Sequence, residues 1–291
     1  MTAVTGQLLT PLAGDLASDS KRGQVVGTVA SGLLTGILVS RTASGLLADA
    51  FGWRAIYGVA AVADAALAIL LARAIPVLPT RPVVKYAALL GSVFAAVRRY
   101  RSVQITLVIG ALSFAVFTLF WTGLTFLLSS PPFSFSVTKI GLVGLVGLAG
   151  AVAAQRAGRL HDRGWSIPAT GAGLALALAS LVLAAAAGSS IVIVLAAVLL
   201  IDIAIQGVNV LNQTRLFSVD RAARSRLNTA FVACNFLGGA VGSLLAGVLW
   251  SRFAWFGITF GGAAAIGVAL IVWNAQRGRA LAFPLRSDRA E

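Results

Sequence analysis

The chain has 291 residues, of which 58% are apolar and 11% are charged, and its formal net charge is +14. Soluble globular domains carry about 25% charged residues, so this composition excludes an ordinary soluble protein and indicates a membrane protein. A single Cys and a single His exclude an intrachain disulfide and argue against a Cys/His metal site or a His-based catalytic triad. We therefore expect neither an enzyme nor a bound cofactor.

Apolar runs long enough to cross a bilayer, which takes about 20 residues, follow one another along the chain. A short first run covers about 1–17. Full-length spans are predicted near residues 24–48, 53–75, 103–128, 137–155, 167–187, 190–213, 227–250 and 254–274. The predicted fold class is an all-α polytopic membrane protein with eight to nine transmembrane helices.

One gap between spans is long, at residues 76–102. It opens with three prolines and continues with apolar residues at helical spacing beside basic ones, a pattern typical of an amphipathic helix on the membrane surface. An ordinary linker helix without lipid contact explains the pattern equally well. In either case the gap is the best domain boundary in the chain.

The cations are distributed unevenly between the two sides of the predicted membrane topology. Nineteen of the 23 Lys and Arg residues lie in alternate gaps or at their edges, within residues 21–22, 73–101, 156–163, 215–226 and 277–289. Cytoplasmic loops are enriched in Lys and Arg, so these loops and the C-terminus are predicted to lie in the cytoplasm, with the chain in the plasma membrane. Cations divided among loops favour anionic lipid headgroups as partners and argue against nucleic acid.

A weak internal repeat suggests that the chain derives from two similar halves. A shift of 202 residues pairs residues 44–58 with 246–260 and aligns Trp53 with Trp255. This shift is about the length of six spans with their loops, as in transporters built from repeated bundles.

Three stretches resemble the major facilitator superfamily, and within it the bacterial efflux branch of drug and sugar proton antiporters. Residues 15–57 are similar to the end of helix four through the start of helix six, 157–166 to the cytoplasmic loop motif Gly-x-Leu-x-Asp-Arg-x-Gly, and 201–231 to helix ten and its following loop. The resemblance implies two six-helix bundles and transport by alternating access.

On this alignment the N-terminal bundle is incomplete, because helices one to three would precede the chain. We expect residues 1–76 to form the remnant of that bundle, 77–102 the cytoplasmic linker, 103–276 the C-terminal six-helix bundle and 277–291 a cytoplasmic tail. Two functional hypotheses follow. The chain is a secondary transporter that exports a small organic compound in exchange for protons, or it is a truncated, transport-incompetent fragment with a structural role only.

Four polar residues interrupt the span near 190–213. They are Asp202, Gln206, Asn209 and Gln213, at spacings of four, three and four, which place them on one face of a helix. Polar groups inside a membrane are costly and mark function by default, so this stripe predicts contact with substrate or protons. Hydrogen bonding between neighbouring helices is the alternative. Asn235, in the next span, is a further candidate.

Arg41 occupies a place where the resembled family has a Gly-Pro-rich antiporter motif. Gly32, Gly36 and Gly45 of that motif remain, whereas Ser40, Arg41 and Ser44 replace two glycines and the proline. Three interpretations of Arg41 stay open: it binds an anionic substrate, it pairs with a carboxylate such as Asp202, or it extends its charge towards the outer interface.

The resemblance also implies a conformational latch at Gly158, Asp162 and Arg163. There the Asp162 carboxylate would cap a helix or pair with a basic residue of the other half in one state only.

Two residue types are interpreted as structural. Gly238 and Gly242, four apart, are typical of helices that approach closely. Five tryptophans lie near predicted span ends and are interpreted as interface anchors, namely Trp53, Trp121, Trp165, Trp250 and Trp255.

Overall fold

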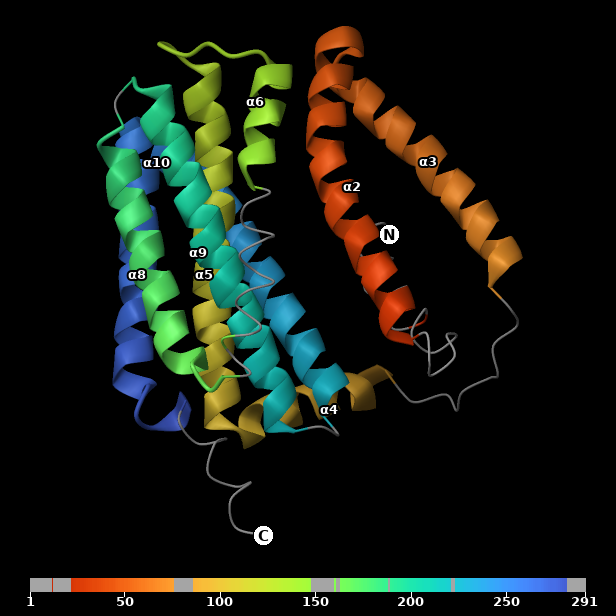
Figure 1. Ribbon diagram of the computed structural model, residues 1–291, viewed down its shortest axis with the longest axis vertical. Helices are drawn as coiled ribbons and strands as arrows, with labels where there is room; N and C mark the ends of the chain where they lie inside the picture. The colour runs from red at the N-terminus through yellow and green to blue at the C-terminus, as the bar shows by residue number, and fades with distance from the viewer. Residues whose placement is uncertain are drawn as a thin grey trace. The chain divides into compact units, whose positions relative to one another are not determined.

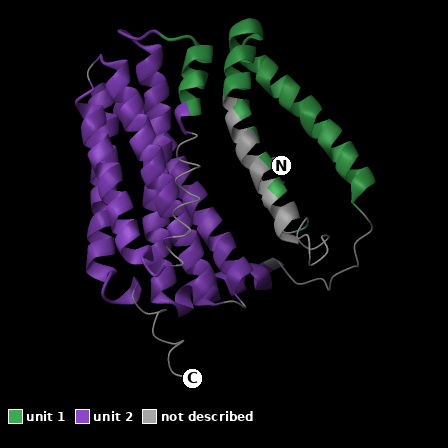
Figure 2. Cartoon of the chain, viewed as in Figure 1, with its two compact units in different colours: residues 1–81, 135–145 green, residues 82–134, 146–291 purple. Residues whose placement is uncertain are grey.

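A computed structural model describes residues 12, 22–75, 86–147, 160, 163–187, 189–220 and 223–281 of the chain (Figure 1). Within these ranges every regular element is a helix. The chain divides into two compact units, one of residues 1–81 with 135–145 and one of residues 82–134 with 146–291 (Figure 2).

The first unit contains a helical hairpin and one short helix. Its elements are α2 (Arg22–Phe51), α3 (Trp53–Ala74) and α6 (Val137–Val143). Gly52 joins α2 to α3 with φ of 80°, a conformation that favours glycine. The short helix packs on α2, where the Asp49 carboxylate accepts a hydrogen bond of 2.9 Å from the Thr138 backbone N–H. Gly45 permits this approach, because a Cβ there would lie 2.9 Å from the Val137 carbonyl oxygen.

The second unit is a bundle of long helices. Its elements are α4 (Tyr86–Arg99), α5 (Arg101–Ser129), α8 (Ser166–Ala185), α9 (Ile191–Val219) and α10 (Arg224–Gln276). A 3₁₀ turn, η1 (Gly144–Gly147), lies where the two units meet along the chain. Ala254, with φ of 48° and ψ of −140°, divides α10 into two helices.

Five of the described helices are long and apolar enough to cross a membrane. They are α3, α5, α8, α9 and α10, and they cover the spans predicted near 53–75, 103–128, 167–187, 190–213 and the pair 227–250 and 254–274. α2 is helical throughout the span predicted at 24–48. The predicted run at 1–17 lies outside the described residues except for residue 12, as does the predicted span 137–155 beyond residue 147. The total of eight to nine spans stays a prediction.

Small residues bring α5 and α10 into close contact. A Cβ at Gly238 or Gly242 would collide with the backbone carbonyls of Ala111 and Ala115. At the same contact the Thr118 hydroxyl donates a 2.8 Å hydrogen bond to the Gly239 carbonyl. The packing predicted for these glycines is therefore what the structure shows, and it fixes α5 against α10.

The predicted linker helix is present as α4, which in Figure 1 crosses the end of the long helices of its unit. Val93 and Val97 pack on a core cluster that includes Ala96. Elsewhere on the helix, Leu89 and Phe94 are exposed, Phe94 by 68%. α4 therefore buries one apolar face in the bundle and also carries apolar side chains that the bundle leaves exposed.

Candidate functional site

Asp202 is a buried carboxylate in the interior of α9. Its side chain is 3% exposed. One carboxylate oxygen, Oδ1, accepts a 3.0 Å hydrogen bond from the Trp121 indole Nε1–H of α5. The other, Oδ2, faces Gly147, where a Cβ would lie only 2.5 Å away. A carboxylate inside a membrane-spanning helix is costly. The indole hydrogen bond to Asp202 and the close approach that Gly147 permits therefore indicate a site that is formed around the Asp202 carboxylate.

The rest of the predicted stripe extends along α9 towards α10. The Asn235 Nδ2 donates to Asn209 Oδ1 at 3.0 Å, and the Gln213 Nε2 donates to Asn228 Oδ1 at the same distance. Hydrogen bonding between helices, the alternative interpretation of the stripe, therefore describes the contacts of Asn209 and Gln213. No hydrogen bond of the Gln206 side chain occurs among the described residues.

One atom of this network has no partner. Asn235 Oδ1 is buried and makes no hydrogen bond within the described ranges. It lies beside α5 at Gly110, where a Cβ would be 2.9 Å from it. Buried polar atoms are nearly always satisfied in folded proteins, so this oxygen can accept a hydrogen bond from a molecule that enters the network.

Aromatic rings extend along α5 from Trp121, whose indole binds the carboxylate. Phe114 stacks on Phe117 at 5.8 Å between ring centroids, and Phe117 contacts Trp121 at 6.3 Å. Phe236 of α10 packs edge-on against Phe114 at 6.0 Å. An aromatic surface next to a few directed polar groups is the usual composition of small-molecule sites.

The remaining predicted site residues are Arg41 and the residues of the predicted latch, Gly158, Asp162 and Arg163. Arg41 belongs to α2 in the other unit, and its side chain is not described. Gly158 and Asp162 lie outside the described residues. Arg163 is exposed in a turn whose ends are joined by a 2.9 Å hydrogen bond from the Trp165 N–H to the Leu160 carbonyl.

Sequence reasoning missed three contributors to the site. Trp121 was interpreted as an interface anchor, and the structure corrects this: its indole binds Asp202 and it lies eight residues before the end of α5 at Ser129. That distance from the helix end was the available signal. Gly147 and Asn228 carried no signal of their own, because their roles depend on which helices pack together.

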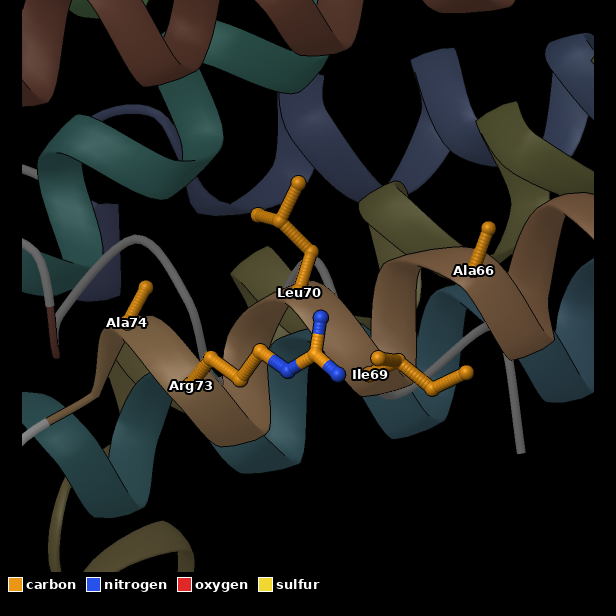
Figure 3. Close-up of a pocket in the computed structure, with 5 residues that line it drawn as sticks. All are labelled: Ala66, Ile69, Leu70, Arg73 and Ala74. Atoms are coloured by element: carbon orange, nitrogen blue, oxygen red, sulfur yellow. The ribbon is translucent and has the colours of Figure 1, made fainter.

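A shallow surface hollow also occurs on α3, in the first unit (Figure 3). It is lined by five residues of that one helix, namely Ala66, Ile69, Leu70, Arg73 and Ala74. Since α3 has no buried residue and one helix cannot enclose a ligand, we assign this hollow no binding role.

Membrane-length helices with a buried carboxylate and hydrogen-bonded amides between them are typical of multi-pass membrane transport proteins. Residues 1–219 match the Major Facilitator Superfamily, and the chain belongs to that superfamily.

The relatives are named as transporters. The chain is 41% identical over 271 residues to the "Uncharacterized transporter YgaY" of Escherichia coli O157:H7, an alignment that covers 93% of this chain and 69% of the relative. It is 34% identical over 256 residues to the "Probable transporter SCO4007" of Streptomyces coelicolor, covering 88% and 59%. A solved "Structure of a bacterial metal transporter" matches 95% of this chain and 71% of its own with a TM-score of 0.61 and 17% identity, a likeness of fold alone.

Proposed function

We propose that this superfamily member is a proton-coupled transporter that exports a small organic compound by alternating access, and that Asp202 carries the proton. The observation that supports this role is the burial of Asp202 within α9 together with its hydrogen bond from Trp121. Burial disfavours the carboxylate anion, whereas the indole N–H stabilises it. A conformational change that moves α5 away from α9 would remove the indole hydrogen bond from the buried carboxylate and so favour its protonated form. Proton binding would in this way be coupled to the movement of the helices.

The substrate would lie beside the proton site. Gln206, Asn209, Gln213 and Asn235 supply amide donors and acceptors, and the unpartnered Asn235 Oδ1 is one acceptor that a substrate N–H or O–H would satisfy. The aromatic rings of α5 supply an apolar wall. In this proposal Arg41 contributes a cation from the first unit, for an anionic group of the substrate or for Asp202.

The proposal includes a latch and an orientation. Gly158, Asp162 and Arg163 would hold one conformational state through the loop carboxylate. The basic loops and the C-terminus would face the cytoplasm, where anionic headgroups attract them. The exposed apolar residues of α4 would then rest on the cytoplasmic membrane surface, as in an interfacial helix.

The test is a proton-flux measurement in proteoliposomes that hold a pH-sensitive dye and an imposed pH gradient. Addition of a substrate from a panel of lipophilic drugs and sugars should collapse the gradient. Asp202→Asn should reduce this substrate-dependent flux at least tenfold. Asp64→Asn, which changes an exposed carboxylate on α3, is the matched control and should leave the flux unchanged.

Three results would contradict the proposal in distinct ways. Unchanged flux in Asp202→Asn removes the proton role of that residue. Substrate uptake without proton movement shows a transporter that is not proton-coupled. A chain that moves no compound of the panel favours the alternative, a structural fragment that transports nothing.

A further inference from the structure

The helix α4 carries an exposed apolar stripe next to the face that its unit buries. Leu90, Phe94 and Arg98 follow one another at intervals of four residues and so lie along one side of the helix. Val93 and Val97, which pack on the core cluster, come three residues after Leu90 and Phe94 and are their neighbours on the helix surface. Leu90 is 43% exposed and Phe94 is 68% exposed. The apolar arc of α4 is therefore wider than the part that the bundle covers.

The stripe ends among exposed cations. α4 ends with Arg98 and Arg99, and Arg101 begins α5. The Arg99 guanidinium lies over the Tyr100 ring, 5.5 Å from its centroid, and the Arg101 Nη1 donates a 3.1 Å hydrogen bond to Gln104 Oε1. Both partners are uncharged. Within the described ranges none of these three guanidinium groups forms an ion pair.

A hydrogen-bonded contact brings a fourth cation to the same end of the unit. The Tyr100 hydroxyl donates to Asp220 Oδ2 at 3.1 Å, and the Ala223 backbone N–H donates to Asp220 Oδ1 at 3.2 Å. Arg224, the next residue, is exposed at the start of α10. Asp202, the other acid that the structure describes in this unit, lies in the interior of α9. Positive charge is therefore in excess around Tyr100.

The helix that follows α4 places these arginines at the level of lipid headgroups. α5 is a candidate membrane span of 29 residues, which is about 43 Å of helix. A bilayer with its headgroup regions is about 40–45 Å thick. Since α5 begins at Arg101, the end of α4 lies at one membrane surface, and α4 crosses the ends of the long helices there (Figure 1).

A phospholipid with an anionic headgroup matches both parts of this surface. Leu90 and Phe94 gain by contact with acyl chains instead of water. Each basic residue close to an anionic membrane surface adds about fivefold to the affinity, and guanidinium groups bind phosphate oxygens through paired N–H donors.

We propose that the end of α4 is a binding surface that selects anionic phospholipid. The surface consists of two apolar and four basic side chains, namely Leu90, Phe94, Arg98, Arg99, Arg101 and Arg224. The headgroup phosphate lies among the guanidinium groups and the acyl chains cover the apolar stripe. The inference rests on the proposed function only for the position of α4 on the membrane surface, and it requires neither proton exchange nor transport.

The lipid would also stabilise the attachment of α4 to the bundle. The Tyr100 hydroxyl joins the end of α4 to the end of α9 through Asp220, and Ala96 of α4 belongs to the cluster that contains Leu216 and Leu227. A lipid that holds the arginines in place therefore favours the folded unit, because ligands that bind only the folded state stabilise it.

The first experiment measures thermal melting of the purified chain in nanodiscs of phosphatidylcholine that contain increasing fractions of phosphatidylglycerol. Phosphatidylglycerol should raise the melting temperature by several degrees. The double variant Arg98→Gln with Arg99→Gln should need at least tenfold more phosphatidylglycerol for the same rise, whereas Arg98→Lys with Arg99→Lys retains both charges and should keep most of it.

Arg54→Gln is the matched control. Arg54 is also exposed and also lies over an aromatic ring, 4.5 Å from the centroid of Trp53, but it belongs to the first unit. It should respond to phosphatidylglycerol as the unmodified chain does.

The second experiment tests the apolar stripe. Cys234 is the single cysteine of the chain, so Cys234→Ser with Phe94→Cys carries one thiol, to which a fluorophore is attached. Lipids with a nitroxide on the acyl chain should quench this fluorophore more strongly than aqueous iodide does. Ala95→Cys is the control, because residue 95 is also exposed but points about 100° away on the helix, and its fluorophore should be quenched less by the nitroxide lipid.

Three results would overturn the inference. One is a melting temperature that does not depend on phosphatidylglycerol, or that rises equally in the double Gln variant. Another is an equal rise produced by soluble glycerol phosphate in pure phosphatidylcholine, which would show a site for a free anion. The third is a residue 94 fluorophore that only iodide quenches. Loss of the proposed proton flux with these lipid effects intact would refute the proposed function and leave the lipid surface standing.

Discussion

Replacement of Gly242 by Ala tests whether the contact between α5 and α10 holds the second unit together. The added methyl would meet the Ala115 carbonyl and would lie 2.5 Å from the Thr118 Oγ1. Both groups are poorly able to move, because one is helix backbone and the Thr118 hydroxyl is held by hydrogen bonds to the Gly239 carbonyl and to its own helix. The helices must therefore separate to accept the methyl.

The expected magnitude follows from two opposing effects. Overpacking a well-packed contact costs about 1–3 kcal/mol, and a backbone collision places this variant near the upper end. Ala is the better helix former by about 1 kcal/mol. The net loss should be about 2 kcal/mol, which corresponds to roughly 4–8 °C in melting temperature for a chain of this size.

Gly247→Ala is a matched control in the same helix. Gly247 has nothing within 4 Å of the position of a Cβ, so only the gain in helix propensity applies, up to about 1 kcal/mol. Melting of both variants in one detergent, followed by circular dichroism, gives the comparison. If Gly242→Ala melts at or above the temperature of Gly247→Ala, the close α5–α10 contact does not carry the stability that we assign to it.

Three further predictions concern the two units. Trp121→Phe removes the indole N–H from Asp202 and should lower stability by about 2 kcal/mol, the usual worth of a hydrogen bond to a charged group, measured by thermal melting. Gly147→Ala places a methyl against Asp202 and should reduce proton-coupled flux even though no polar group is lost. Hydrogen bonds from the Thr138 side chain and backbone lower the pKa of Asp49 below its ordinary 3.8. Ionised Asp49 therefore stabilises the α2–α6 contact above about pH 4, and this contribution should disappear as the pH falls below that value and in Asp49→Asn, as followed by hydrogen exchange of the Thr138 amide.

Helical periodicity was enough to predict which face of α9 is polar. The spacing of Asp202, Asn209 and Gln213 depends on local geometry alone, and the structure places the partners of all three on helices of the same unit. The identity of those partners depends on tertiary packing. Trp121 is 81 positions from Asp202 along the chain, and no local pattern could connect them.

Sequence analysis grouped Arg215 with the loop cations at 215–226, whereas the structure places it inside α9. Sequence analysis ends a span where cations begin, since a charge in a membrane is costly. α9 instead continues four residues beyond Arg215 to Val219, and Leu216 joins a buried apolar cluster with Leu227 and Phe231. Packing of these side chains extends the helix past the charge, and hydroxyls of α8 replace part of the water that the guanidinium loses.

The glycine contact and the carboxylate site are connected through α5. Ala115 and Thr118 face α10, and Trp121, about one turn further on, reaches Asp202 of α9. α5 is therefore held between two helices by contacts that lie within two turns of each other. A shift of α5 on α10 would carry the Trp121 indole with it and change the distance to the carboxylate. The small-residue contact thus sets the position of the Trp121 indole, a hydrogen-bond donor to the carboxylate of the proposed proton site.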